Sequence, residues 1–180
     1  LDQSVLARCN LFGVLGSLGY LVAQDPQSRD FLPRNKLAIR FSVRGGPKAV
    51  LQLGPDSARM VEQAPAQVVL GFTSPEHCNR MVAGRANPVP LWGLQHLAYL
   101  TGGFGKLTNR LERFLRPPAE VLADPAQFKL AAELTLHTAM SALVQIANHD
   151  MRGRLSAGRI PDGVLQIEVA GGVAVRLEVQ

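Results

Sequence analysis

The sequence of 180 residues predicts an α+β fold, because helical and strand patterns occupy separate stretches of the chain. Apolar residues recur at helical spacing in residues 1–24, alternate with polar residues through 37–72, and return to helical spacing in 104–116 and 126–149. The hydrophobic fraction of 47% and the charged fraction of 18% fit a globular protein and argue against disorder. We expect an antiparallel or mixed sheet of about five strands with packed helices, plus an extra C-terminal helix and hairpin.

The first expected helix, residues 1–24, has a large apolar face and a face of glycines where another backbone could approach. Its uncharged part, residues 9–24, is shorter than the roughly 18–20 residues that span a bilayer, and no basic stretch precedes it. We therefore expect a buried helix, ended by Asp25–Pro26, and not a signal peptide. The apolar face consists of Leu11, Leu15, Leu18 and Val22, and the small face of Gly13, Gly16 and Gly19.

Alternating apolar residues then predict strands at 37–43 and 49–53, joined by the sequence RGGPK. A five-residue loop, Arg44–Lys48, keeps the apolar side chains of both strands on one face. Two further strands, ARMVEQ and AQVVLGF, are expected to extend this hairpin into an antiparallel meander. The expected pairs are Val43 with Ala49, Phe41 with Leu51, and Ile39 with Leu53.

A short helix is predicted at residues 74–84, because its start and end signals are both present. Ser74 can cap the first turn, and Gly84 can end the helix in a left-handed conformation. His77 and Cys78 are neighbours in this helix and point about 100° apart, so they are poorly placed to act as a nucleophile and its base or to share a metal ion.

The apolar segment 91–104 fits a helix through Leu91, Leu94, Leu97 and Leu100, while Leu97 and Tyr99 also fit a short strand. A basic amphipathic helix follows at 104–116, and Pro117–Pro118 ends it. Its apolar face contains Leu107, Leu111 and Phe114, and its basic face Lys106, Arg110 and Arg113.

The stretch YLTGGFGKLTNR, residues 99–110, contains the glycines and lysine of a phosphate-binding loop but not their spacing. A Walker loop, G-x-x-x-x-G-K-[ST], requires a glycine where this chain has Leu100 and a magnesium-binding hydroxyl where it has Leu107. We interpret the glycines as the turn that begins helix 104–116.

The C-terminal part is predicted to be a buried helix, about 126–149, followed by a hairpin. His137 is expected to be satisfied within the packing of this helix. A two-residue Gly171–Gly172 turn would place polar residues opposite apolar ones. A three-residue loop, Ala170–Gly172, keeps the apolar residues together and is therefore preferred. It pairs Val169 with Val173, Ile167 with Val175, and Leu165 with Leu177.

The order of an apolar helix, a proline, a strand, two glycines and a strand occurs twice, about 126 residues apart. The strand and glycines read FSVRGG at 41–46 and IEVAGG at 167–172. The helices before them end in VAQD and IANHD, which favours a true repeat over two unrelated hairpins.

Residues 31–116 resemble the lipid-binding domain of the sterol carrier protein type-two family. The resemblance rests on the four strands, on the helix SPEHCNRMVAGR, on the apolar segment ending in LAYLTGG, and on the closing helix KLTNRLERFL. It implies a mixed sheet with helices on one side, enclosing a tunnel for sterols, fatty acids or acyl chains, and no catalytic residues. The chain then divides into an apolar helix (1–30), the lipid-binding domain (31–118) and the start of a second copy (119–180).

The net charge of +5 is concentrated in residues 29–48, which hold six basic residues against one acid. Such a surface suits an anionic membrane, an acidic protein or nucleic acid. Nucleic acid is not expected, since aromatic residues form only 6% of the chain and no motif accompanies the charges. We predict that an anionic membrane is preferred by the basic residues Arg40, Arg44, Lys106, Arg110 and Arg113.

The function that these features favour is non-catalytic binding of an apolar ligand, and the alternative is an interaction or oligomerisation module. In the alternative, the last hairpin joins the 37–72 sheet of its own chain or that of a second subunit. The four histidines, His77, His96, His137 and His149, show no catalytic or metal-binding spacing, so no enzyme, cofactor or metal is expected. Cys9 and Cys78 are expected to be reduced thiols of a cytoplasmic protein. The expected ligand-binding residues are Leu91, Trp92, Leu94, Leu97, Tyr99 and Phe104.

Overall fold

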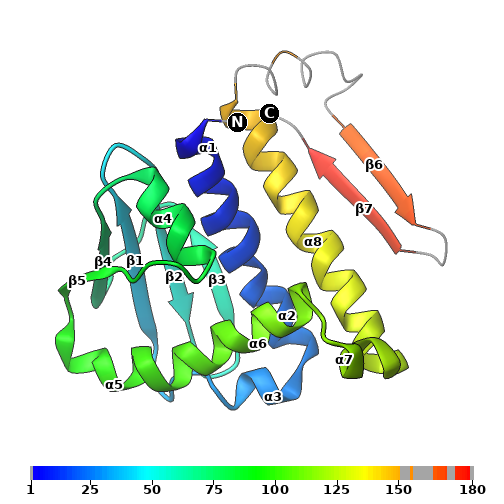
Figure 1. Ribbon diagram of the computed structural model, residues 1–180, viewed down its shortest axis with the longest axis horizontal. Helices are drawn as coiled ribbons and strands as arrows, with labels where there is room; N and C mark the ends of the chain where they lie inside the picture. The colour runs from blue at the N-terminus through cyan, green and yellow to red at the C-terminus, as the bar shows by residue number, and fades with distance from the viewer. Residues whose placement is uncertain (1, 151–154, 156–163, 170–172, 179–180) are drawn as a thin grey trace.

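The computed structural model describes residues 2–150, 155, 164–169 and 173–178, and its fold is α+β (Figure 1). A five-stranded mixed sheet has the strand order β3-β2-β1-β4-β5, and a separate two-stranded sheet is formed by β6 and β7. The strands are β1 (Leu37–Val43), β2 (Lys48–Leu53), β3 (Ala58–Val61), β4 (Val68–Phe72), β5 (Val89–Trp92), β6 (Val164–Val169) and β7 (Val173–Glu178).

The first hairpin, β1–β2, has a shorter turn than expected. Phe41 pairs with Ala49 and Ile39 with Leu51, and the amide of Val43 donates to the carbonyl of Pro47 at 3.3 Å. The expected register is therefore wrong by two residues. A shift of two keeps every side chain on its face, so the hydrophobic pattern could not exclude it. Gly45 makes the tight turn possible, because its φ of 69° is favourable only for glycine.

The expected antiparallel meander ends at β3, because β4 pairs in parallel with β1 on the other side of the first hairpin. The connection between β3 and β4 must therefore cross the sheet. Hydrogen bonds hold it there: Gln67 donates its amide to the carbonyl of Ala38 at 3.0 Å, and Arg40 donates to the carbonyl of Ala64 at 2.9 Å.

One helical run at the N-terminus packs against the sheet, and its sequence order is α1 (Gln3–Arg8), a π-helical turn η1 (Cys9–Val14), a 3-10 turn η2 (Leu15–Ser17) and α2 (Leu18–Gln24). The expected apolar face is buried, with Leu11 and Leu18 fully inaccessible. These side chains share a hydrophobic core with the apolar faces of β1 and β2 and with Leu107, Leu111 and Phe114. Short helix α3 (Pro26–Arg29) follows.

The start and end signals predicted for the short helix are confirmed in α4 (Pro75–Val82). The Ser74 hydroxyl accepts from the amide of His77 at 3.2 Å, and Gly84 has a φ of 71°. After β5 the chain enters one helical run made of η3 (Leu94–His96), α5 (Leu97–Tyr99), a π-helical turn η4 (Leu100–Phe104) and α6 (Gly105–Leu115). The glycines at 102 and 103 thus lie inside a π-helical turn of this run and do not form the separate turn that was expected to begin helix 104–116.

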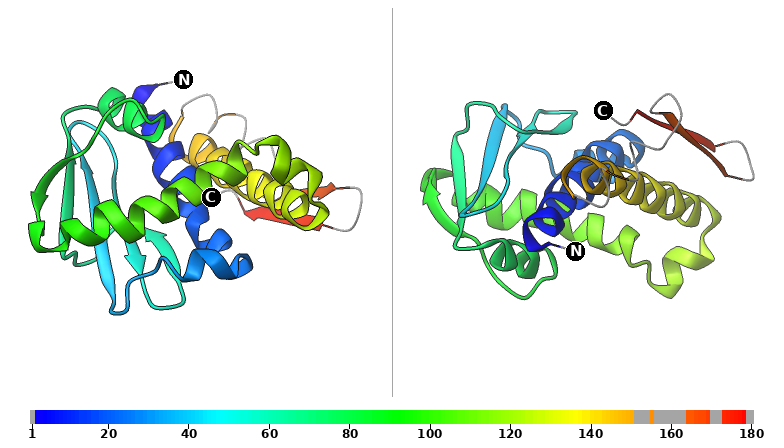
Figure 2. Two further views of the ribbon diagram at one scale, coloured as in Figure 1. Left: turned by 60° about the horizontal axis from the view of Figure 1, so that its bottom comes forward. Right: turned by 90° about the horizontal axis from the view of Figure 1, so that it is seen from above.

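Helix α8 (Pro125–His149) follows the short helix α7 (Ala119–Ala123) and lies beside the N-terminal run (Figures 1 and 2). The expectation that it is buried is wrong, since Ala131, Leu134 and Met140 are its only buried residues. Leu143 is 44% exposed and Phe128 is 51% exposed. In both figures the N-terminal run lies between the five-stranded sheet and α8, so α8 is separated from that sheet.

The last hairpin has the expected register, with Val169 opposite Val173 and Leu165 opposite Leu177. It forms a sheet of its own beside α8, so the expected pairing with the 37–72 strands of the same chain does not occur. Its register repeats that of β1–β2, with each residue number raised by 126. For example, Phe41 pairs with Ala49, and Ile167 pairs with Val175. The repeated order seen in the sequence is therefore a repeated helix–hairpin arrangement.

Candidate functional site

The residues expected to bind an apolar ligand lie on the surface at β5, η3 and α5. Leu91 is 60% exposed, Trp92 68% and Leu94 62%. Tyr99 and Phe104 are half-buried, and the Tyr99 hydroxyl donates to the carbonyl of Phe31 at 3.2 Å. None of the six expected residues lines either of the two cavities described below.

The residues expected to face a membrane divide into two groups. Arg44, Lys106 and Arg113 are exposed. Arg40 is half-buried against the β3–β4 connection, and Arg110 makes a two-bond ion pair with Asp25 at 2.9 and 3.1 Å. The guanidinium groups of Arg40 and Arg110 are thus engaged within the fold, which leaves the first three to meet a partner.

A groove of about 740 Å³ lies between the N-terminal helical run, the edge strand β3 and α8. Figure 2 shows β3 and α8 on either side of the N-terminal run. Its walls are mostly apolar, and several polar groups reach it from α8 and β3. Its lining residues include Phe12, Tyr20, Met60, His137, Met140 and Ser141.

Glycines on the N-terminal run allow the groove walls to approach closely. A Cβ atom on Gly19 would lie 2.6 Å from the carbonyl oxygen of Ala58 on β3, and one on Gly13 would lie 3.1 Å from the Cβ of Ala142 on α8. Real Cβ atoms cannot lie as close as the first of these contacts. The glycine face noted in the sequence therefore serves two neighbours, the sheet edge on one side and α8 on the other.

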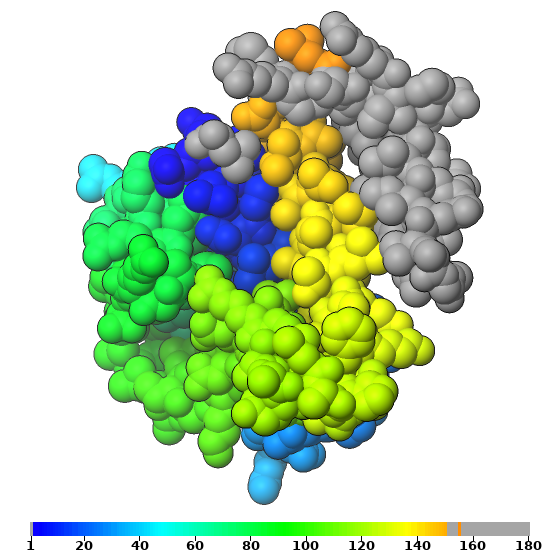
Figure 3. Space-filling view, turned by 45° about the vertical axis from the view of Figure 1, so that its right-hand side comes forward, coloured from blue at the N-terminus to red at the C-terminus, as the bar shows by residue number. Residues whose placement is uncertain are grey.

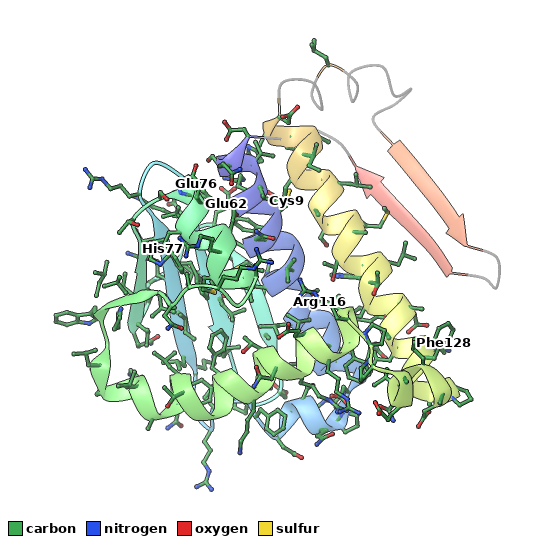
Figure 4. All side chains as sticks on the ribbon, in the orientation of Figure 1. Cys9, Glu62, Glu76, His77, Arg116 and Phe128 are labelled. Atoms are coloured by element: carbon green, nitrogen blue, oxygen red, sulfur yellow. The ribbon has the colours of Figure 1, made fainter. Side chains whose placement is uncertain are left out.

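The contact between the N-terminal run and α8 is fixed by polar groups at one end of the groove. Arg8 donates to the side chain of Gln145 at 3.2 Å and forms an ion pair with Glu62. The Cys9 thiol, which begins the π-helical turn η1, faces the carbonyl of Ala142 at 3.5 Å (Figure 4). A π-helical turn inserts one residue and often marks a functional position. Here it contains Phe12, which lines the groove.

A polar cluster of Tyr20, Glu133 and His137 marks the other part of the groove. The Tyr20 hydroxyl donates to Glu133 at 3.0 Å, and the rings of Tyr20 and His137 stack with centroids 5.1 Å apart. Burial, and then the hydrogen bond to Glu133 and its charge, raise the pKa of Tyr20. Burial lowers the pKa of His137, which favours a neutral imidazole.

The Nδ1 atom of His137 is buried and has no hydrogen-bond partner among the residues that the structure describes. The expectation that this histidine is satisfied by packing is therefore wrong. A buried polar atom without a partner costs about 1–3 kcal/mol, so a group supplied from outside would be favourable here. This cluster could not be predicted from the sequence, because Tyr20 and His137 are distant along the chain.

A second cavity, of about 590 Å³, lies between α3 and α6. We call it the basic groove. It carries four basic side chains and one acidic one, Glu112, which pairs with Arg116 at 3.4 Å. Its lining residues are Gln27, Phe31, Lys106, Asn109, Arg110, Glu112, Arg113, Arg116 and Pro118.

His77 and Cys78 do not form a catalytic pair. The two ring nitrogens of His77 are 3.2 Å from the amide of Thr73 and 2.9 Å from the carbonyl of Asn87, so this side chain fastens α4 to the segment before β5. Burial raises the pKa of the Cys78 thiol to about 12, which removes its reactive thiolate form at neutral pH. In the described part of the chain, no group of three or more His, Cys, Asp or Glu residues is placed to hold a metal ion.

Comparisons with models of protein families, with curated proteins and with solved structures found no match to the chain. Two helical stretches, Gln3–Gln24 and Pro125–His149, are long and apolar enough to cross a membrane by length and composition. The core helix of a globular protein meets the same criterion, and the first stretch is buried against the sheet.

Proposed function

We propose that this protein is a non-catalytic binder of a single apolar ligand, which lies in the groove between the N-terminal run, β3 and α8. The observation that carries the proposal is a groove of about 740 Å³ with apolar walls and one buried, unpartnered polar atom, His137 Nδ1. Ligand sites in proteins commonly have volumes of about 300–1,000 Å³, apolar walls and a few polar groups that orient the ligand.

The ligand class follows from the lining of the groove. Phe12, Met60 and Met140 offer apolar surface, on which each buried methylene contributes about 0.8 kcal/mol. Methionine side chains adapt to chains of different shape. The imidazole of His137 lines the groove and would orient a hydroxyl or carboxyl group at one end of the ligand. Sterols, fatty acids and acyl chains combine these two properties, and the family resemblance implies the same class.

A second candidate function, an oligomerisation module, is favoured by the surface of α8. Phe128 and Leu143 are large apolar side chains that remain about half exposed on one helix. A second subunit that covered them would bury apolar surface on both partners. This candidate requires no ligand, and the two functions are separable by experiment.

The test is a titration of purified protein with a fluorescent fatty acid and a fluorescent sterol, together with native mass spectrometry. We expect micromolar binding of at least one probe to one site per chain. Ser141→Phe should fill the groove and weaken binding about tenfold or more, because Ser141 lines it. Ala139→Phe is the matched control, since Ala139 is exposed on α8 and does not line the groove.

A second variant tests the polar end. His137→Leu replaces the imidazole by an apolar side chain of similar length and so removes the ring nitrogens that would bond the ligand. The affinity for the ligand should therefore fall about fivefold. Equal affinity of the wild type and Ser141→Phe for the probes would contradict the groove as the ligand-binding site. A protein that binds neither probe and has the mass of a dimer would instead support the oligomerisation module.

A further inference from the structure

A second surface, outside the groove, exposes large apolar side chains next to one another in the chain. We call it the apolar strip, and it spans β5, η3 and the start of α5. Isolated exposed apolar residues are ordinary, but a contiguous set of this kind marks an interaction surface. The exposed fractions are 45% for Val89, 60% for Leu91, 68% for Trp92, 62% for Leu94 and 48% for Leu97.

Local backbone geometry holds the strip in this position. The pairing of β4 with β5 shifts between Val69 and Leu70, and Leu91 lies over Gly71, where a Cβ atom would be 2.7 Å from Leu91 Cδ1. Gly93 has a φ of 85°, and a Cβ there would lie 2.4 Å from the carbonyl of Gln67. The chain therefore turns sharply at Gly93, between Trp92 at the end of the edge strand and Leu94 at the start of the helical run.

The chain segment that contains the strip carries charge of one sign. No acidic residue occurs between Glu76 and Glu112, and this stretch contains the whole strip. The helical run that begins with Leu94 continues into α6, which supplies Lys106, Arg113 and Arg116 to the basic groove. Figure 1 shows β5 and α5 at the left-hand end of the molecule, with α6 leading from α5 toward its centre.

We propose that the apolar strip and the basic groove dock together onto an anionic phospholipid bilayer. Tryptophan is favoured at the interface between headgroups and acyl chains, and leucines next to it would enter the acyl boundary. Lys106 and Arg113 are exposed and would meet phosphate groups, each contributing on the order of a fivefold gain in partitioning near an anionic surface. An apolar surface flanked by cations fits this partner better than an uncharged one.

The experiment measures binding of the full chain to vesicles of phosphatidylcholine with and without phosphatidylserine, by sedimentation and by Trp92 fluorescence. Trp92 is the single tryptophan, so its emission reports the strip directly. We expect binding to the anionic vesicles, a shift of the emission to shorter wavelength, and weaker binding at high salt. Neutral vesicles should bind much less protein.

Two double variants separate the two parts of the surface. Leu94→Asp with Leu97→Asp removes the apolar contact, and Lys106→Glu with Arg113→Glu reverses the charge. Each should weaken binding to anionic vesicles about tenfold or more. Leu122→Asp is the control: this residue is also about half exposed, and it lies on α7 at the far side of the molecule from β5 (Figure 1).

Three results would overturn the proposal. The first is equal binding of the wild type to neutral and anionic vesicles, and the second is strip variants that bind vesicles like the wild type. The third is a wild-type protein that is dimeric and does not bind vesicles, together with strip variants that are monomeric. The last result would identify the strip as a contact with a second copy. Ser141→Phe should leave vesicle binding unchanged, so failure of the ligand groove and failure of membrane docking are distinguishable.

Discussion

The two helix–hairpin arrangements of this protein share a sequence pattern and a strand register but differ in how well their helices are covered. In the first, Leu18 and Leu21 of the N-terminal run are completely buried against the sheet. On α8, which precedes the second hairpin, Leu143 is 44% exposed and Ile146 is half-buried. Figure 3 shows α8 at the molecular surface over much of its length.

The difference lies in the strands that surround each hairpin. Strand β1 is paired on both sides, with β2 and with β4, and the resulting sheet has room to cover the N-terminal run. Strand β6 is paired with β7 in a sheet of two strands. The same local pattern thus gives the same hairpin in both places, whereas burial of the helix depends on strands contributed by residues 58–92. Local periodicity specifies an element, and long-range pairing specifies its burial.

The largest effect that tests this comparison is expected from matched truncations of the two helices. Leu18→Ala should lower the free energy of unfolding by about 2–5 kcal/mol, because Leu18 is inaccessible and part of the core. Leu143→Ala, at an exposed position of α8, should cost less than about 1 kcal/mol. Urea unfolding followed by circular dichroism measures both. Equal losses would show that α8 is covered as well as its counterpart.

Much of the local structure could be predicted from the sequence. The helices at 3–24, 105–115 and 125–149 follow from apolar periodicity, and the register of the last hairpin follows from its alternation. The register of the first hairpin and the parallel position of β4 could not be predicted. Both alternatives keep the same residues facing the core, so the hydrophobic pattern is equally satisfied by either.

The candidate sites were harder to predict for two reasons. The groove combines Tyr20, Met60 and His137, which belong to three separate elements, and only the tertiary arrangement brings them together. The segment containing Trp92 and Leu94 was expected to line a cavity because apolar runs usually lie inside a protein. Its position at the edge of the sheet exposes it, and an edge position cannot be read from composition.

The next effect concerns the end of the N-terminal run, where Asp25 joins the helix to α6. Burial opposes the charged form of this carboxyl, but hydrogen bonds from Arg110 and Ser28 and the charge of Arg110 outweigh it, so its pKa lies below the ordinary 3.8. Asp25→Ala would leave Arg110 without its buried partner and should cost about 3 kcal/mol. Asp30→Ala, at an exposed position, should cost less than about 0.5 kcal/mol.

The dependence of this effect on pH follows from the direction of the shift. A carboxyl whose pKa is lower in the folded state stabilises the fold above its unfolded pKa, and that contribution is lost as the pH falls through the folded-state pKa. The difference in unfolding free energy between wild type and Asp25→Ala should therefore be full at pH 7 and shrink below about pH 4. A constant difference at all pH values would contradict the ion pair as its cause.

A smaller effect is expected at the turn of the first hairpin. Gly45→Ala places a side chain at a φ of 69°, although no atom lies within 4 Å of the new Cβ. The cost is therefore conformational and should be about 1 kcal/mol in urea unfolding. Gly102→Ala is a suitable control, since a Cβ there would also meet open space, but the residue lies in a helical turn and its φ is not positive. This control should be neutral or slightly stabilising.

The smallest effect is a difference in amide hydrogen exchange between β1 and β6, the first strands of the two hairpins. Its measurement needs no substitution. Amides of β1 point toward β2 and β4 in turn, and both neighbours supply carbonyl acceptors. Amides of β6 have a strand partner on the β7 side. We expect slow exchange along all of β1, and slow exchange at only alternate residues of β6, measured by NMR or mass spectrometry. If all β6 amides are slow, and become faster on dilution, the hairpin pairs with the sheet of a second subunit. That result would make the two arrangements equivalent in the assembled protein and would support the oligomerisation module.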